Sequence, residues 1–245
     1  AEVSIFMPRY GTIDEKKYHI KPYLTGLKVP TGEIAGITEL ICNVKVREGN
    51  KREPTIYFLE NMEYYEKRAN VYGYSDDHVR FALLSRGALE FVKASGMHPA
   101  VIHCNDWHTA LIPLLVGEHL KVGYDRHKET IQSARAKTIL TIHNLLYTGE
   151  TGVSIALKLG LPQSVLHVFS TPLGQAVRLM EEGMEYVDRV TTVSPTYATE
   201  IMAGGHGKSI VNVFKRRGDA IVGILNGIDS DAWDPQTDKE LPHPF

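Results

Sequence analysis

The residues best suited to chemistry in this sequence are crowded into one short segment, IHCNDWHTALIPLL, residues 102–115. It places two imidazoles, a carboxylate and an amide between two apolar runs, in the side chains of His103, Asn105, Asp106 and His108. Polar groups that leave water cost free energy unless they find partners. The cluster is therefore either satisfied locally, as the cap of a following helix, or held ready to bond a ligand.

A metal site is one interpretation of this cluster, because His103, Cys104, Asp106 and His108 are all possible ligands. Zinc sites favour histidines three or four residues apart on a helix, or paired cysteines. His103 and His108 instead lie five residues apart across an expected strand-to-helix junction. We therefore expect no metal here. Two interpretations remain: Asn105 or Asp106 caps a helix, or the segment binds a ligand. They are compatible, because an Asp106 that caps a helix can also bond a ligand.

Three other familiar sites are disfavoured by their spacing. The segment GGHGKS, residues 204–209, has Met202 where a Walker phosphate loop needs glycine, so we expect a mobile connection there. No G-x-G-x-x-G pattern occurs, which gives a self-contained dinucleotide site no support. Ser194 lacks the G-x-S-x-G elbow of a hydrolase nucleophile, and Pro195 suits the first turn of a helix.

Composition narrows the classes of function. The 245 residues are 43% apolar and carry a formal net charge of -2, which allows a real core and argues against a nucleic-acid or membrane surface. Two cysteines, Cys42 and Cys104, are too few for a disulfide framework and favour a reducing compartment. No apolar run approaches the roughly 20 residues that cross a bilayer. We expect a soluble protein with neither nucleic acid nor membrane as partner.

The elements that must position these residues alternate between strands and helices. Strands are expected at 3–8, 40–47, 55–60, 100–103, 137–143, 189–194 and 220–227, with an irregular polar stretch after the first. Helices are expected at 78–95, at 109–120, within 174–187 and around 197–202. This alternation implies right-handed βαβ units. We predict one α/β domain with a Rossmann-like, doubly wound, mainly parallel sheet and helices on both faces.

Polar residues follow the apolar runs of four of these strands. They are Asn105 and Asp106, then His143 and Asn144, then Ser194, and finally Asn226. In a parallel sheet the carboxyl ends of the strands lie on one edge, which is where open α/β folds bind ligands. We therefore expect Asp106, His143 and Asn226 to meet at one cleft.

The segment 61–74 adds four tyrosines beside charged residues. Such rings stack on sugars, and they also pack a loop against a sheet. Packing is favoured for Tyr72 and Tyr74, while both interpretations stay open for Tyr64 and Tyr65.

Several motifs together resemble the glycogen and starch synthases. They are HCNDWHTAL, TIHNLLYTGE, VTTVSPTYATEI and GILNGIDSDAWDP, in this order and spacing, with YGYSDDHVRFALLSRGALEF similar to the helix that precedes the D-W-H segment in the family. These enzymes are retaining glucosyltransferases that extend α-1,4-glucans from ADP-glucose or UDP-glucose, and they have a GT-B fold of two Rossmann-like halves.

The resemblance implies that residues 1–245 are the amino-terminal, acceptor-side half of a GT-B fold. The carboxyl-terminal nucleotide-binding half and the family's K-x-G-G-L loop are not within these residues. Both supply phosphate contacts, so we expect this chain alone to be inactive.

The resemblance also implies roles for individual residues. Asp106 and His143 are the expected catalytic residues, and His143 matches the family histidine that contacts the donor glucose. Substrate-binding roles are implied for Asn144, Asn226, His108, Asn105 and Tyr65. Asn105 stands where many bacterial members have histidine, and the aromatic acceptor contact falls near Tyr64 or Tyr65.

The implied partners are an α-1,4-glucan acceptor, ADP-glucose or UDP-glucose, and the carboxyl-terminal domain. No resident cofactor is expected, because the nucleotide sugar is a substrate. The expected location is the bacterial cytoplasm or the plastid stroma. Two alternatives stay open: a non-catalytic α-glucan-binding module, and a GT-B transferase with another donor.

Overall fold

A computed structural model of the chain describes residues 2–32, 37–121, 136–205 and 208–243. The chain forms two compact units, a first unit of Ala1–Val190 and a second unit of Thr191–Phe245. The connection expected at 204–209 includes residues 206 and 207, which lie outside the described residues. No described helix has the length and apolarity needed to span a membrane.

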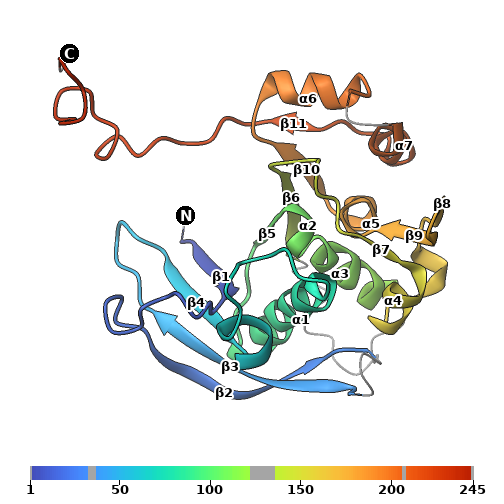
Figure 1. Cartoon of the computed structure of the whole chain (residues 1–245), viewed down its shortest axis with the longest axis horizontal. Helices are drawn as coiled ribbons and strands as arrows, with labels where there is room; N and C mark the ends of the chain where they lie inside the picture. Colours follow the sequence, from blue (N-terminus) through green and yellow to red (C-terminus); the bar gives the residue numbers. More distant parts are fainter. Residues whose placement is uncertain (1, 33–36, 122–135, 206–207, 244–245) are drawn as a thin grey trace. The chain divides into compact units, whose positions relative to one another are not determined.

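The first unit begins with a four-stranded sheet in the order β1-β4-β3-β2 (Figure 1). Its strands are β1 (Ser4–Pro8), β2 (Lys21–Pro30), β3 (Glu39–Arg47) and β4 (Thr55–Glu60). The β1–β4 pair is parallel, whereas β2–β3 and β3–β4 are antiparallel. The prediction of an irregular polar stretch is wrong at β2, an edge strand in which only Leu27 and Val29 are buried, so apolar alternation is weak.

Helix α1 (Asp77–Ser95) covers this sheet, and its range confirms the helix expected at 78–95. It ends at Gly96, whose φ of 69° is the left-handed conformation common at helix ends. A short π-helix, Met62–Glu66, precedes it and starts at Asn61, whose side chain accepts the Tyr64 N–H. The helix and the sheet share a core that includes Val44, Val46, Leu59, Tyr65, Phe81, Leu84 and Phe91.

The second sheet of the first unit carries the D-W-H segment. Strands β5 (Val101–Asn105) and β6 (Lys137–Ile142) are parallel, and β10 (Arg189–Thr192) is the other neighbour of β6. The helix expected at 109–120 is confirmed as α3 (Leu111–Lys121), and a separate short helix, α2 (Asp106–Thr109), precedes it with a break at Ala110. Pro113 explains the break, because it has no N–H to bond the Thr109 carbonyl and fits only in the first turn of a new helix.

A small antiparallel sheet in the order β7-β9-β8 completes the first unit. Its elements and neighbours are β7 (Glu150–Gly152), α4 (Val153–Lys158), the 3-10 turn Gln163–Val165, β8 (Phe169–Thr171), β9 (Gly174–Arg178) and α5 (Leu179–Tyr186). The helix expected within 174–187 is confirmed as α5, whereas strand β9, which precedes it, was not expected. A short apolar run of this kind fits either a strand or a helix, and pairing of β9 with β7 and β8 decides for the strand.

The second unit contains helices α6 (Pro195–Met202) and α7 (Lys208–Arg217). The Ser194 side chain caps α6 by accepting the Tyr197 N–H, and Pro195 occupies the first turn. Strand β11 is only Val222–Gly223, paired parallel with Thr191 and Thr192. The strand expected at 220–227 is thus shortened to two residues.

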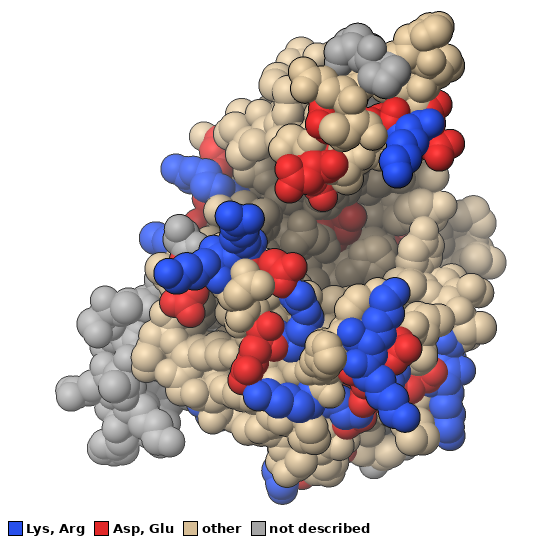
Figure 2. Space-filling view, turned by 90° about the vertical axis from the view of Figure 1, so that its left-hand side faces the viewer, with Lys and Arg blue, Asp and Glu red and all other residues tan. Residues whose placement is uncertain are grey.

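Charged side chains of both signs are interspersed over the face drawn in Figure 2. This mixture agrees with the nearly balanced formal charge of -2.

Candidate functional site

The parallel register of β5 and β6 builds the centre of the candidate site. Asn105, the last residue of β5, is paired with Thr141 of β6, so the residues that follow each strand emerge side by side. These are Asp106 after β5 and His143 after β6. The predicted meeting of two strand ends therefore occurs within the first unit.

Asp106 ties these two ends together. Its Oδ1 accepts the backbone N–H of His143 at 2.8 Å and that of Asn144 at 3.4 Å. Its φ of 53° lies in the left-handed region, which aspartate tolerates better than most residues. Its Oδ2 has no hydrogen-bond partner within the described parts of the chain. One carboxylate oxygen is thus structural, and the other is available to a ligand.

The capping interpretation of the segment is wrong in its details. Asn105 occupies the N-cap position of α2, but its side chain caps no backbone N–H. Its Oδ1 lies 2.9 Å from Nε2 of His143 instead. The amide therefore orients the imidazole of His143, which is itself exposed. The Asn144 side chain is also exposed, and it accepts the Leu146 N–H at 2.8 Å.

The two histidines of the D-W-H segment have separate surroundings. His103 Nε2 lies 2.6 Å from Thr141 Oγ1, so His103 belongs to the strand pair. The His108 ring lies 4.3 Å from that of Phe81 and 4.5 Å from that of Trp107. Burial lowers the pKa of His108, although the carboxylates of Asp106 and Asp77 oppose the shift. A neutral His108 can act as donor and acceptor. Among the described residues, no group of three His, Cys, Asp or Glu side chains is placed to hold a metal ion.

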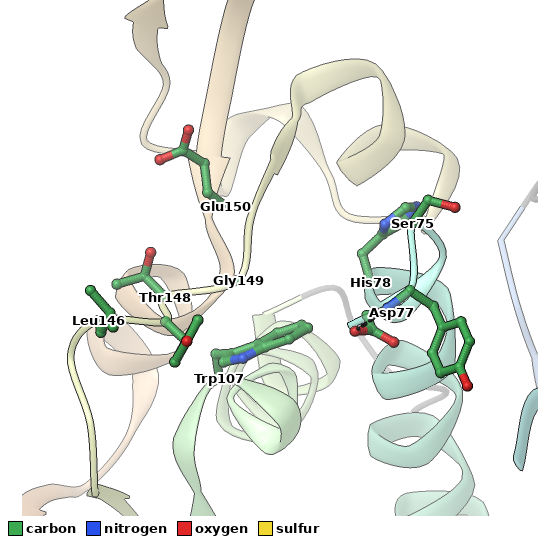
Figure 3. A pocket seen from close by; sticks show the side chains of 10 residues that line it. Ser75, Asp77, His78, Trp107, Leu146, Thr148, Gly149 and Glu150 are labelled. Carbon is green, nitrogen blue, oxygen red and sulfur yellow. Dashed lines mark hydrogen bonds between the residues drawn. The ribbon is translucent and has the colours of Figure 1, made fainter. Parts of the chain in front are cut away.

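An open pocket of about 360 Å³ lies beside this centre in the first unit (Figure 3). In Figure 3 the Trp107 indole lies between the segment 146–150 and the start of α1 at Asp77 and His78. The lining combines aromatic rings with hydroxyl and carboxyl groups, in Tyr74, Ser75, Asp77, His78, Trp107, Leu146, Tyr147, Thr148, Gly149 and Glu150. Aromatic faces with convergent polar groups at the rim suit a sugar ring, which has apolar faces and an equatorial belt of hydroxyls.

The wall that carries Trp107 depends on a glycine. Gly149 has a φ of 68°, and a Cβ atom there would lie 2.5 Å from Cε3 of Trp107. Only glycine therefore allows the indole to pack directly on this backbone.

The tyrosines of segment 61–74 differ from expectation in two places. Tyr65 is fully buried, and its hydroxyl donates to the Arg80 carbonyl at 2.8 Å, so it offers a ligand no surface and its implied substrate contact is incorrect. Tyr72, for which packing was favoured, is 56% exposed, with its ring 6.0 Å from that of His108 and 6.4 Å from that of Tyr147. Tyr74 is packed, with its ring 5.1 Å from the Arg68 guanidinium.

Asn226 lies in the second unit and is exposed. That Asn226 meets Asp106 and His143 at one cleft stays a prediction.

Sequence reasoning missed most of the pocket lining. The segment 146–150 and the residues at the start of α1 carry no local signature, because their side chains converge only when α1 lies beside the loop that follows β6. The sequence offered only a weak signal, the polar pair Asp76-Asp77 at an expected helix start.

Comparison of the chain with known proteins identifies its family. The family described as "Starch synthase catalytic domain" matches residues 1–216. A glycogen synthase of Anaeromyxobacter sp. (strain Fw109-5) is 35% identical over 244 residues, which are 98% of this chain and 48% of that relative. A glycogen synthase of Bacillus subtilis (strain 168) is 34% identical over 243 residues, 98% of this chain and 47% of that relative. The chain thus spans about half the length of the relatives it matches.

A solved structure agrees with these relatives. The catalytic domain of starch synthase IV from Arabidopsis thaliana, bound to ADP and acarbose, matches with a TM-score of 0.78 and 27% identity, over 99% of this chain and 48% of that chain. The predicted fold class is confirmed as an α/β, GT-B type arrangement with parallel strands and helices on both sides. On the family match and these similarities, the chain belongs to the starch and glycogen synthase family of glycosyltransferases and corresponds to its amino-terminal portion.

Proposed function

We propose that this chain is the acceptor-side part of a glucosyltransferase that extends α-1,4-glucans with retention, from ADP-glucose or UDP-glucose. The observation that carries the proposal is the arrangement of Asp106, Asn105 and His143 at adjoining strand ends, beside an aromatic and polar pocket. In this proposal the pocket holds the glucan, and the exposed His143 and the unpartnered oxygen of Asp106 contact the reacting glucose.

Glucosyl transfer with retention requires polar side chains of this kind near the sugar. Glucosyl transfer with retention develops positive charge at the sugar ring and negative charge on the departing diphosphate, so fixed dipoles and hydroxyl partners near the ring are valuable. Carboxylate, amide and imidazole groups form directional bonds with sugar hydroxyls. In this scheme Asp106 and His143 are catalytic, and Asn144, His108, Asn105 and Asn226 bind substrate. This scheme uses no resident cofactor, because the nucleotide sugar arrives as a substrate.

We further propose that residues 1–245 bind glucan without transferring glucose. The family resemblance implies that most contacts to the diphosphate are made by segments other than residues 1–245. Closure of two halves around the substrates would also exclude water and favour transfer over hydrolysis. The working partner is then a carboxyl-terminal nucleotide-binding domain, in a bacterial cytoplasm or a plastid stroma.

The test is incorporation of radiolabelled glucose into glycogen, with ADP-glucose and UDP-glucose supplied in separate assays. It compares residues 1–245 alone with a protein in which they replace the corresponding half of a full-length relative. We expect transfer only by the chimaera, with one donor preferred. Binding of maltooligosaccharide with no transfer by a folded chimaera would instead identify a non-catalytic glucan-binding module. Transfer from a different nucleotide sugar alone would indicate another GT-B activity.

A further inference from the structure

Arg80, in the first turn of α1, is a charged residue with no access to solvent. Its side chain is 0% exposed, and its Nη1 pairs with Asp77 Oδ1 at 2.5 Å. Its Nη2 is buried and has no hydrogen-bond partner in the parts of the chain that the structure describes. Burying an incompletely bonded guanidinium costs free energy, so a well-packed apolar residue would serve stability at least as well. Stability alone therefore does not explain why a buried arginine occupies this position.

Arg80 supports one wall of the pocket directly. Asp77, its ion-pair partner, uses Oδ2 to accept the N–H groups of Gly73 at 2.5 Å and Tyr74 at 3.0 Å. The guanidinium carbon also lies 5.0 Å from the centre of the Tyr74 ring. Asp77 and Tyr74 both line the pocket. One buried side chain thus fixes both the carboxylate and the ring of this wall.

The same guanidinium also reaches Trp107, another residue that lines the pocket, through Phe81. Its carbon lies 5.4 Å from the Phe81 ring centre. The Phe81 ring meets Trp107 at 5.1 Å and His108 at 4.3 Å, both edge-on. The charge of Arg80 also acts on His108, since it adds to the lowering of the His108 pKa that burial begins.

Two hydrogen bonds anchor this arrangement to the π-helix Met62–Glu66. Arg80 Nε donates to the Tyr64 carbonyl at 2.7 Å, and the Arg80 carbonyl accepts the Tyr65 hydroxyl at 2.8 Å. The forked guanidinium can hold Asp77 and the Tyr64 carbonyl at once while lying against Tyr74, which an ammonium on a flexible stem does less well.

We propose that Arg80 is a positioning residue of the pocket: it sets the Tyr74–Asp77 wall directly and the Trp107 ring through Phe81. Its effect on glucan affinity rests on the function proposed above, whereas its effect on the shape of the pocket does not. Arg80 touches no substrate in this scheme. It acts through the residues that line the pocket.

The test uses Trp107 as a reporter. The chain has two tryptophans, and Trp233 is 73% exposed in the second unit, so Trp233→Phe leaves Trp107 as the single tryptophan. In this background Arg80→Met removes the charge at similar length. Arg86→Met is the matched control, because Arg86 lies on the same helix and donates to the Leu159 carbonyl at 2.7 Å but does not line the pocket. Circular dichroism and thermal melting establish that each variant is folded.

We expect Arg80→Met to change acrylamide quenching of Trp107 and to weaken maltoheptaose binding by about tenfold, as displacement of a site wall does. Arg86→Met should leave both unchanged even if it lowers the melting temperature. By NMR, the His108 pKa should rise in Arg80→Met, because a neighbouring positive charge is lost. Should Arg80→Met fail to fold, Arg80→Lys replaces it, with smaller changes in quenching and affinity expected and no rise of the His108 pKa, because the positive charge is kept.

The possible failures are distinguishable. Unchanged quenching, affinity and His108 titration in a folded Arg80 variant would overturn the positioning role and leave the proposed function intact. Equal shifts in the Arg80 and Arg86 variants would also overturn it, because they would indicate general loosening. If the unsubstituted chain does not bind maltoheptaose but Arg80→Met still alters Trp107, the positioning role stands and the glucan function falls.

Discussion

Among single residues, Asp106 matters most to the proposed function, because its two carboxylate oxygens have different roles. One carboxylate oxygen accepts the N–H groups of His143 and Asn144, and the residue adopts a left-handed conformation with φ of 53°. Strained backbone at a non-glycine residue persists only when the surroundings enforce it, and it is common at functional sites. A residue that only joined two strand ends would not need the charge on its second oxygen.

Asp106→Asn separates these two roles. The amide oxygen can still accept both N–H groups, and asparagine tolerates a positive φ, so the free energy of unfolding should change by less than about 0.5 kcal/mol. Glucose transfer in the chimaera should fall about a hundredfold, as for loss of one well-placed charged group in a closed site. Chemical denaturation and initial rates measure the two effects. Asp106 would be purely structural if the rate stayed at the level of the unsubstituted chimaera.

Among the elements, the loop after β6 contacts helix α2 through Gly149 and Trp107. Gly149 lies against Trp107 so closely that a Cβ there would be 2.5 Å from the indole. The positive φ of Gly149 thereby determines the position of the Trp107 indole in the pocket.

Gly149→Ala should destabilise the fold by about 2 kcal/mol, through backbone strain and overlap with Trp107. Gly96→Ala is the control, since Gly96 has a nearly equal φ of 69° and no atom within 4 Å of the added Cβ. It should cost about 1 kcal/mol, from strain alone. Trp107 emission in the Trp233→Phe background should shift only in Gly149→Ala. Equal stability loss and equal spectra in the two variants would show that the contact does not determine the indole position.

Helix α5 carries a second element-scale feature, the buried carboxylate of Glu182. Its oxygens accept the His167 backbone N–H at 2.7 Å and lie 2.9 Å from His167 Nδ1. Glu185 faces the other side of the His167 ring, with its Oε1 3.9 Å from Nε2. Burial raises the pKa of the Glu182 carboxyl above its ordinary value of 4.5, although the bonds from His167 and the charge of that ring oppose the rise. The charge of Glu181 adds to the rise.

A raised pKa means that the folded chain holds this proton more tightly than the unfolded chain. The stability that Glu182 contributes is therefore complete below pH 4.5 and is lost as the pH rises through the raised value. Glu182→Gln has no such titration, so its free energy of unfolding relative to the unsubstituted chain should increase with pH. Denaturant titrations across this range, with the exposed Glu200→Gln as control, measure the difference. A difference that is flat or decreases with pH would contradict the assignment.

At the scale of the whole molecule, the strand ends of the parallel sheet were predictable and the pocket was not. Asn105 ends β5, and Asp106 and His143 directly follow β5 and β6, so local pattern and sheet geometry suffice to bring them together. Tyr65 was misplaced because four tyrosines in one segment cannot be sorted into buried and exposed without the path of the π-helix. Strands β2 and β9 were missed because pairing with neighbours, rather than their own pattern, makes them strands.

The proposed function requires that the pocket beside Asp106 and His143 bind an α-1,4-glucan. The most direct measurement is titration of the Trp233→Phe chain with maltoheptaose, followed by Trp107 fluorescence, with cellohexaose as the β-linked control. We expect a saturable change with a Kd of about 1 mM, a typical scale for a weak open site, and no change with cellohexaose. A response that does not saturate, or is the same for both sugars, would contradict it.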